Sequence, residues 1–191
     1  MSASDPGPVQ LLFVCTANRI RSPFAAAVAV ERVTVLGLPI TVDSAGLLEG
    51  GEPAVEQMVR AATRHGVDLS PHVSSQVTAP MLEASDLVVT MTGRHVLGLI
   101  EIDPTCQHRA LTLREWGARS LNGDPITDWT STAVREWAAR ATDRPIGALM
   151  SEAADIVDPM SQRWPRTRRT AALIAELVTV ALDPAAREAR T

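Results

Sequence analysis

Hydrophobic positions along the chain follow two patterns that alternate. Runs that are apolar at nearly every position are typical of parallel strands, which are buried on both faces. In this chain such runs lie at 9–14 and 86–91, and more polar strand-like segments lie at 39–46, which ends in small residues, and at 109–113. Helical spacing or helix-capping residues mark the segments between and after them, at 24–36, 53–65, 79–84, 92–100 and 164–182. The alternation predicts an α/β fold with three layers, a four-stranded parallel twisted sheet that carries helices on both faces.

The segment between the first strand and its helix carries distinctive chemistry. Cys15 ends the strand, and Arg21 precedes a helix that Ser22 would cap and Pro23 would begin. Such a loop can turn several backbone N–H groups toward one anion, and the same field favours a cysteine thiolate. The planar guanidinium of Arg21 can hold two phosphate oxygens. We expect a phosphate loop after the first strand; the alternative is a buried structural cysteine with an arginine nearby by chance.

This loop resembles that of the low-molecular-weight protein tyrosine phosphatase family. The family pattern is close to V-C-x-x-N-x-x-R-S-P, and the segment from Val14 to Pro23 matches it at every specified position. The resemblance implies phosphomonoester hydrolysis through a cysteinyl-phosphate intermediate, with phosphotyrosine in a protein as the first expected substrate. It implies a phosphate-binding loop formed by Thr16, Ala17, Asn18, Arg19, Ile20, Arg21 and Ser22.

Two further matches suggest how this loop is held. Ser44-Ala45-Gly46 matches a Ser-Ala-Gly of the family, and His72 lies in a connector that resembles the family's own. By this resemblance, hydrogen bonds among Asn18, Ser22, Ser44 and His72 would support the loop. The alternatives are an ordinary strand-to-loop turn at 44–46 and a surface histidine at position 72.

The family's general acid lies in an Asp-Pro pair shortly before the last helix, where this chain has Asp158-Pro159. An acid is needed because an alkoxide or phenolate leaves poorly without a proton. Other Asp-Pro pairs of the chain, which include those that begin at Asp103, Asp124 and Asp183, fit that position less well. The expected catalytic residues are therefore Cys15, Arg21 and Asp158, with no metal and no cofactor.

The substrate is less well defined than the chemistry. Family members that cleave phosphotyrosine usually carry aromatic pocket walls, but Met160-Ser161 and Leu47-Leu48-Glu49 occupy those places here. A tryptophan from elsewhere could replace them: Trp129, Trp137 or Trp164. The partner is therefore a phosphorylated protein or a small non-aromatic phosphate ester.

Two other functions are compatible with parts of this pattern. Arsenate reduction uses the same fold and loop, but thioredoxin-coupled enzymes need two more cysteines, and this chain adds only Cys106. A reductase that uses an external thiol stays open. A binding module without turnover is less well supported, because all three catalytic residue types are present.

Length and composition limit the remaining possibilities. The 191 residues, 46% hydrophobic and 21% charged, fit one globular domain, which we expect at 9–183 between a disordered tail at 1–8 and a tail at 184–191. The segment 117–150 departs from the family and is either a lid or an extension of the core.

A net charge of −4 argues against general nucleic-acid binding. The N-terminus lacks a signal-peptide pattern and no apolar run reaches membrane-spanning length, so we expect a cytoplasmic protein that does not insert into membranes. The oligomeric state is not predicted.

Overall fold

The computed structural model describes residues 7–160 and 164–183. Within these residues four strands form one sheet: β1 Val9–Cys15, β2 Ile40–Gly46, β3 Leu87–Thr90 and β4 Ala110–Thr112. The strands are parallel, in the spatial order β2-β1-β3-β4. The predicted parallel α/β sheet is therefore confirmed. Of the predicted tails, residues 1–6 and 184–191 lie outside the described residues.

Helices connect the strands and continue after β4. The α-helices are α1 Arg21–Leu36, α2 Glu56–Thr63, α3 Ala79–Ala84, α4 Gly93–Ile102, α5 Leu113–Leu121, α6 Ser131–Ala141 and α7 Trp164–Leu182. Short 3-10 helices follow α4 and α6: η1 Pro104–His108, η2 Ile146–Met150 and η3 Glu152–Ala154. None of the described helices combines the length and the apolar character that a bilayer span requires.

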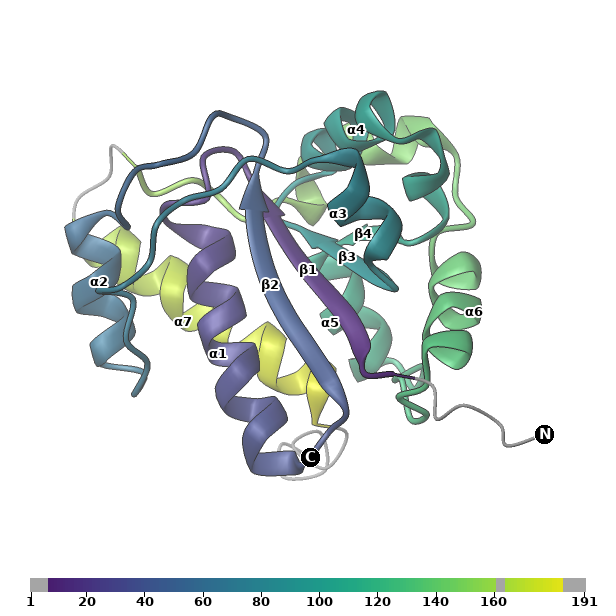
Figure 1. Cartoon of the computed structure of the whole chain (residues 1–191), viewed down its shortest axis with the longest axis horizontal. Coiled ribbons are helices and arrows are strands. Elements are labelled where there is room, and N and C mark those ends of the chain that lie inside the picture. Colours follow the sequence, from purple (N-terminus) through teal and green to yellow (C-terminus); the bar gives the residue numbers. More distant parts are fainter. Residues whose placement is uncertain (1–6, 161–163, 184–191) are drawn as a thin grey trace.

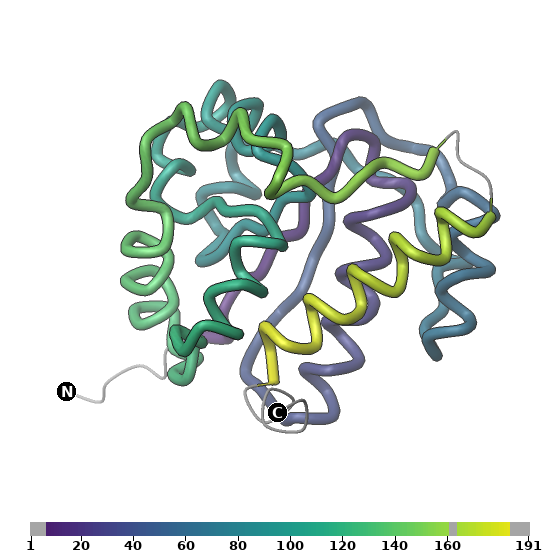
Figure 2. The backbone as a smooth tube through the Cα atoms, turned by 180° about the vertical axis from the view of Figure 1, so that it is seen from behind, coloured from purple at the N-terminus to yellow at the C-terminus, as the bar shows by residue number. Residues whose placement is uncertain are grey.

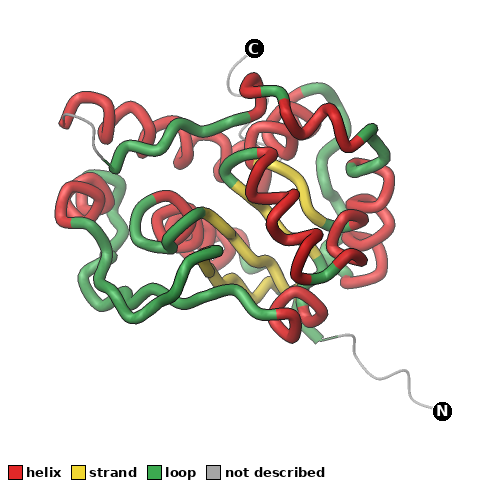
Figure 3. Tube along the Cα trace, turned by 90° about the horizontal axis from the view of Figure 1, so that it is seen from above, coloured by secondary structure: helices red, strands yellow, loops and turns green. Residues whose placement is uncertain are grey.

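The sheet separates two apolar cores. Successive side chains of a strand point to opposite faces, so Leu11 and Phe13 of β1 pack into the core that includes α1, α5 and α7. Leu12 and Val14 pack into the core that includes α3 and α4. Helices cover both faces of the sheet (Figures 1 and 3), and α7 runs across α1 (Figure 2). The three-layer architecture is therefore as predicted.

The carboxyl ends of the central strands meet at one edge of the sheet. Cys15 pairs with Gly46 of β2, and Val14 pairs with Thr90 of β3. The loops after β1 and β2 consequently lie side by side at this edge (Figure 1). Gly46 is required there, because an added Cβ would lie 2.7 Å from the backbone nitrogen of Asn18. In parallel α/β sheets this edge is where ligands bind.

Two local predictions at helix starts were wrong. Ser22 does not cap α1; Ile20 occupies the N-cap position, and no side chain caps it. The Ser22 hydroxyl bonds to partners outside the helix instead. Helix α2 begins at Glu56 rather than near Pro53, because Pro53 forms a bridge with Val73 and its carbonyl accepts from Arg19 Nε at 2.9 Å.

The segment 117–150 extends the core, the simpler of its two interpretations. Its helix α6 begins after Thr130, whose side chain caps it, and buries Val134, Trp137, Ala138 and Ala141. The segment after α6 contacts the start of α4, where the carbonyl of Leu149 lies so close to Gly93 that a Cβ would overlap it. The segment therefore packs against α4, and none of its residues lines the small cavity at Cys15.

Candidate active site

Cys15 lies at the carboxyl end of β1, where the chain leaves the sheet, and its side chain is buried. The Ser22 hydroxyl lies 3.0 Å from Cys15 Sγ and 3.2 Å from the carbonyl oxygen of Ala45. A hydroxyl has one proton to donate, and a thiolate is the stronger acceptor of the two. Ser22 can therefore stabilise negative charge on the sulfur.

The backbone that follows Cys15 turns its carbonyl groups outward. The carbonyl of Cys15 accepts from Leu47 N–H at 3.1 Å, and that of Thr16 accepts from Leu48 N–H at 2.9 Å. The Arg19 carbonyl accepts from Val55 N–H at 3.0 Å. All peptide bonds of the described chain are trans, so the N–H after each of these carbonyls points the other way. Several loop amides therefore face the inner side, the arrangement that binds an anion.

A hydrogen-bonded support holds this loop through Asn18, whose φ of 52° lies in the left-handed region. Asn18 Nδ2 donates to Ser22 Oγ at 3.0 Å and to Ser44 Oγ at 2.9 Å. The backbone carbonyl oxygen of Asn18 can only accept, so His72 Nε2 donates to it at 2.7 Å. The structure thus brings together Asn18, Ser22, Ser44 and His72. The sequence did not reveal Ser75, whose N–H donates to Asn18 Oδ1 at 2.9 Å.

The Arg21 guanidinium connects the loop to the segment before α7. Its Nη1 donates to the carbonyl of Ile156 at 3.0 Å. Its Nη2 donates to Asp158 Oδ2 at 2.5 Å and to Thr16 Oγ1 at 3.2 Å. Arg21 and Asp158 line one small cavity together with Cys15. The structure therefore brings Asp158, 137 positions after Arg21, to the loop that carries Cys15 and Arg21.

The free space over Cys15 is small, and the Asp158 carboxylate occupies the Nη2 edge of the Arg21 guanidinium. The volume of this space is about 10 Å³, barely room for one water molecule. Arg21 Nε is buried and has no hydrogen-bond partner among the described residues. A bound oxyanion would therefore have to displace the Asp158 carboxylate, and it would find one guanidinium N–H already available.

No aromatic side chain of the described residues lines this cavity. The tryptophans considered as replacement walls lie elsewhere: Trp137 is buried and its Nε1 donates to the Asp124 carbonyl, and Trp164 lies under the guanidinium of Arg60 at 4.9 Å. The apolar side chains in the lining are Ala17, Ile20 and Met160, and Arg19 also lines it. The hydrophobic part of the pocket is therefore aliphatic.

His95 reaches the loop from α4 and was not expected in the site. Its Nε2 lies 3.0 Å from Thr16 Oγ1, and its Nδ1 lies 3.0 Å from Thr92 Oγ1. The only signal in the sequence was its place in the first turn of the helix after β3. Because β3 adjoins β1, this turn begins at the same sheet edge as the phosphate loop.

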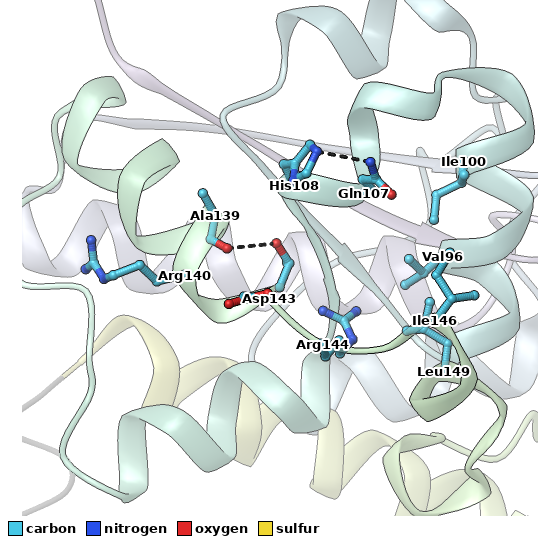
Figure 4. Close-up of a pocket in the computed structure, with 11 residues that line it drawn as sticks. Val96, Ile100, Gln107, His108, Ala139, Arg140, Asp143, Arg144, Ile146 and Leu149 are labelled. Atoms are coloured by element: carbon cyan, nitrogen blue, oxygen red, sulfur yellow. Dashed lines mark hydrogen bonds between the residues drawn. The ribbon is translucent and has the colours of Figure 1, made fainter.

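A larger cavity of about 470 Å³ lies between α4 and the segment that follows α6 (Figure 4). Its walls include Val96 and Ile100 on one side and Arg140 and Asp143 on the other. The residues that line it include none of those predicted for phosphate binding. The chemistry therefore belongs to the small cavity at Cys15 and not to the roomier one.

Fold and site together define a three-layer α/β protein that carries a cysteine in an anion-binding loop after its first strand. The family model described as low molecular weight phosphotyrosine protein phosphatase matches residues 10–128. The chain belongs to this family.

Curated relatives and solved structures agree with this assignment. The probable low molecular weight protein-tyrosine-phosphatase AmsI of Erwinia amylovora is 34% identical over 118 residues, 60% of this chain and 78% of that protein. A protein-arginine-phosphatase of Bacillus subtilis is 32% identical over 119 residues, 62% of this chain and 78% of that protein. The crystal structure of a YwlE mutant from Bacillus subtilis superimposes with a TM-score of 0.67 at 24% identity, covering 96% of this chain and 99% of that one. This last similarity concerns the fold alone.

Proposed function

We propose that the protein hydrolyses phosphomonoesters through a cysteinyl-phosphate, with Cys15 as nucleophile, Arg21 as phosphate ligand and Asp158 as general acid and base. The observation that carries the proposal is the meeting of these three side chains in one cavity, with the Arg21 guanidinium between the loop and Asp158. We expect no metal or cofactor to take part, because sulfur supplies the nucleophile and Arg21 with the loop amides supplies the positive charge.

In the first step the Cys15 thiolate attacks phosphorus and the bond to the leaving oxygen breaks. Arg21 and the inward-facing amides hold the phosphoryl oxygens and the charge that grows on them. Protonated Asp158 gives its proton to the leaving oxygen, so the product departs as an alcohol or phenol.

In the second step water attacks the cysteinyl-phosphate. Asp158, now a carboxylate, takes a proton from the water, and the phosphorus–sulfur bond breaks to give inorganic phosphate and the thiolate. The Ser22 hydroxyl, 3.0 Å from the sulfur, stabilises the departing thiolate. The loop residues Thr16 to Ser22, supported by Asn18, Ser44 and His72, keep this geometry in both steps.

Phosphotyrosine in a protein is the proposed substrate, because AmsI carries that activity in its name and the family model carries it in its description. We place the protein in the cytoplasm, where a thiolate stays reduced. Recovery of the protein from a periplasmic or secreted cell fraction would contradict that placement.

A non-aryl phosphate is the second candidate, favoured by the aliphatic lining of Ile20 and Met160. Reduction of arsenate with an external thiol is the third. The chain offers no ready internal thiol in its place, because burial raises the pKa of Cys106 to about 12.

The experiment is hydrolysis of p-nitrophenyl phosphate without added metal by wild type, Cys15→Ser and Asp158→Asn. We expect Cys15→Ser to abolish turnover and Asp158→Asn to lower kcat by about 100-fold, the contribution of a general acid. Cys106→Ala and Asp124→Asn, which change the other cysteine and another Asp-Pro pair, are the matched controls and should stay near wild type.

A substrate panel then separates the candidates. A phosphotyrosine peptide, an alkyl phosphate and a phosphoarginine peptide are compared by kcat/KM, and preference for either of the last two would overturn the phosphotyrosine assignment. Substantial turnover by Cys15→Ser would refute the nucleophile. Absence of wild-type turnover together with arsenate-dependent thiol consumption would support the reductase.

A further inference from the structure

His95 is a buried titratable group in contact with the phosphate loop, and the mechanism above does not use it. It lies in the first turn of α4 with 5% exposure. Thr92, the N-cap of α4, accepts from the His95 backbone N–H at 3.2 Å and contacts the ring at Nδ1. The cap therefore fixes both the backbone and the ring of His95. The other ring nitrogen meets Thr16, the residue that follows Cys15.

The hydrogen bonds from Arg21 to His95 form a chain with a direction. A guanidinium can only donate, so Thr16 Oγ1 accepts from Arg21 Nη2 at 3.2 Å. The proton of the Thr16 hydroxyl is then available for His95 Nε2 at 3.0 Å. In the order Arg21, Thr16, His95, each hydrogen bond polarises the next. The positive charge of Arg21 therefore favours the tautomer of His95 in which Nε2 carries a lone pair and accepts from Thr16.

A neutral ring suits this position. Burial, with a smaller contribution from the Arg21 cation, lowers the pKa of His95 to about 4. A charged imidazole would bring a second positive group toward Arg21 and would lose its lone pair for Thr16. The ring therefore acts as a neutral hydrogen-bond partner over the ordinary working range of pH.

We infer that His95 positions Arg21 through the Thr16 hydroxyl, as a positioning residue of the phosphate site. The inference rests on the proposed function, because it assigns the way in which the phosphate ligand Arg21 is held. Of the two bonds of Arg21 Nη2, the one to Asp158 is the one that an entering oxyanion replaces. The bond to Thr16 can persist, so Thr16 and His95 keep the guanidinium oriented when Asp158 has moved to the leaving group.

The test is a double-mutant cycle with Thr16→Val and His95→Leu, measured as kcat/KM on p-nitrophenyl phosphate. We expect kcat/KM to fall about tenfold in each single variant and about tenfold in the double variant as well, because both changes break the same chain of hydrogen bonds. His95→Gln, which keeps an acceptor and a donor, and Thr16→Ser, which keeps the hydroxyl, should each restore most of the loss. His108→Leu removes an exposed histidine and is the matched control.

A loss of about 100-fold in the double variant, the product of two independent effects, would overturn the inference. So would activity within twofold of wild type in Thr16→Val, or failure of both conservative variants to restore activity. If His95→Leu does not fold, the comparison of Thr16→Val with Thr16→Ser, each checked by thermal unfolding, provides the same test.

Tungstate binding, measured by calorimetry, separates this inference from the proposed function. If wild type shows no turnover, the proposed function fails, while about tenfold weaker tungstate binding by Thr16→Val than by Thr16→Ser still supports the positioning of Arg21. Equal tungstate affinity in those two variants would overturn the inference whatever the turnover.

Discussion

The His95 ring should make the folded protein sensitive to acid, by an amount that the structure allows to be worked out. Its pKa is lowered from 6.5 to about 4 in the folded chain. In the unfolded chain the ring is exposed and takes up a proton below the ordinary value. Between these two values the unfolded state binds more protons, so stability falls as the pH is lowered through this window and is fully present above it.

The difference between a pKa of 6.5 and one of about 4 corresponds to a loss of about 3 kcal/mol in the free energy of unfolding over the whole window. About 2 kcal/mol of this would be lost between about pH 7 and pH 5, where the unfolded ring is charged and the folded ring is still neutral. The rest would be lost as the pH falls to about 4.

The assay is urea unfolding at both pH values for wild type and His95→Gln. Gln keeps polar atoms for Thr16 and Thr92 but does not titrate, so groups that titrate in both proteins cancel in the comparison. We expect wild type to lose about 2 kcal/mol more than the variant. Parallel losses in the two proteins would refute the reasoning, because they would show that the ring takes up its proton equally in both states.

Two further predictions concern positions away from Cys15. Burial raises the pKa of the Cys106 thiol to about 12, so iodoacetamide should not label it in the native protein but should label it in urea. Mass spectrometry follows the labelling, and equal labelling rates in the two states would show that the site opens. Gly93→Ala should lower the free energy of unfolding by about 1–3 kcal/mol, because the new Cβ would overlap the Leu149 carbonyl. Gly147→Ala, where nothing lies within 4 Å of the added atom, is its control in the same chemical denaturation experiment, and equal effects would mean that the Leu149 contact is easily displaced.

The parts of the fold that the sequence predicted are those that local pattern controls. The strands and α3, α4 and α7 follow from runs and caps, such as Thr92, whose side chain bonds within four residues. The spacing of Cys15 and Arg21 fixes a loop of one size, so its anion-binding character was readable. Ser22 was misread as a cap because its partners, Cys15 Sγ and the Ala45 carbonyl, come from the sheet edge.

What could not be predicted depends on how distant elements pack. Thr16 and His95 are 79 positions apart and meet only because β3 lies beside β1. Two other hydrogen bonds also join distant segments: Ser75 N–H donates to Asn18 Oδ1, and Arg21 Nη1 donates to the Ile156 carbonyl. Packing across α1 also selects the buried face of α7, where Ile174 and Val178 are buried while Ala172 is exposed.

The contact between Arg21 and Asp158 has a consequence for competition at the site. The carboxylate is tethered to the chain, so it competes with every incoming anion at a high effective concentration. The measured affinity for an oxyanion is then lower than the loop alone would provide, by the fraction of molecules in which Asp158 has withdrawn. In the proposed mechanism Asp158 holds a proton when phosphate forms, so it can displace phosphate from the guanidinium only after it has lost that proton. The Asp158 contact thus keeps the buried Arg21 cation paired while no oxyanion is bound.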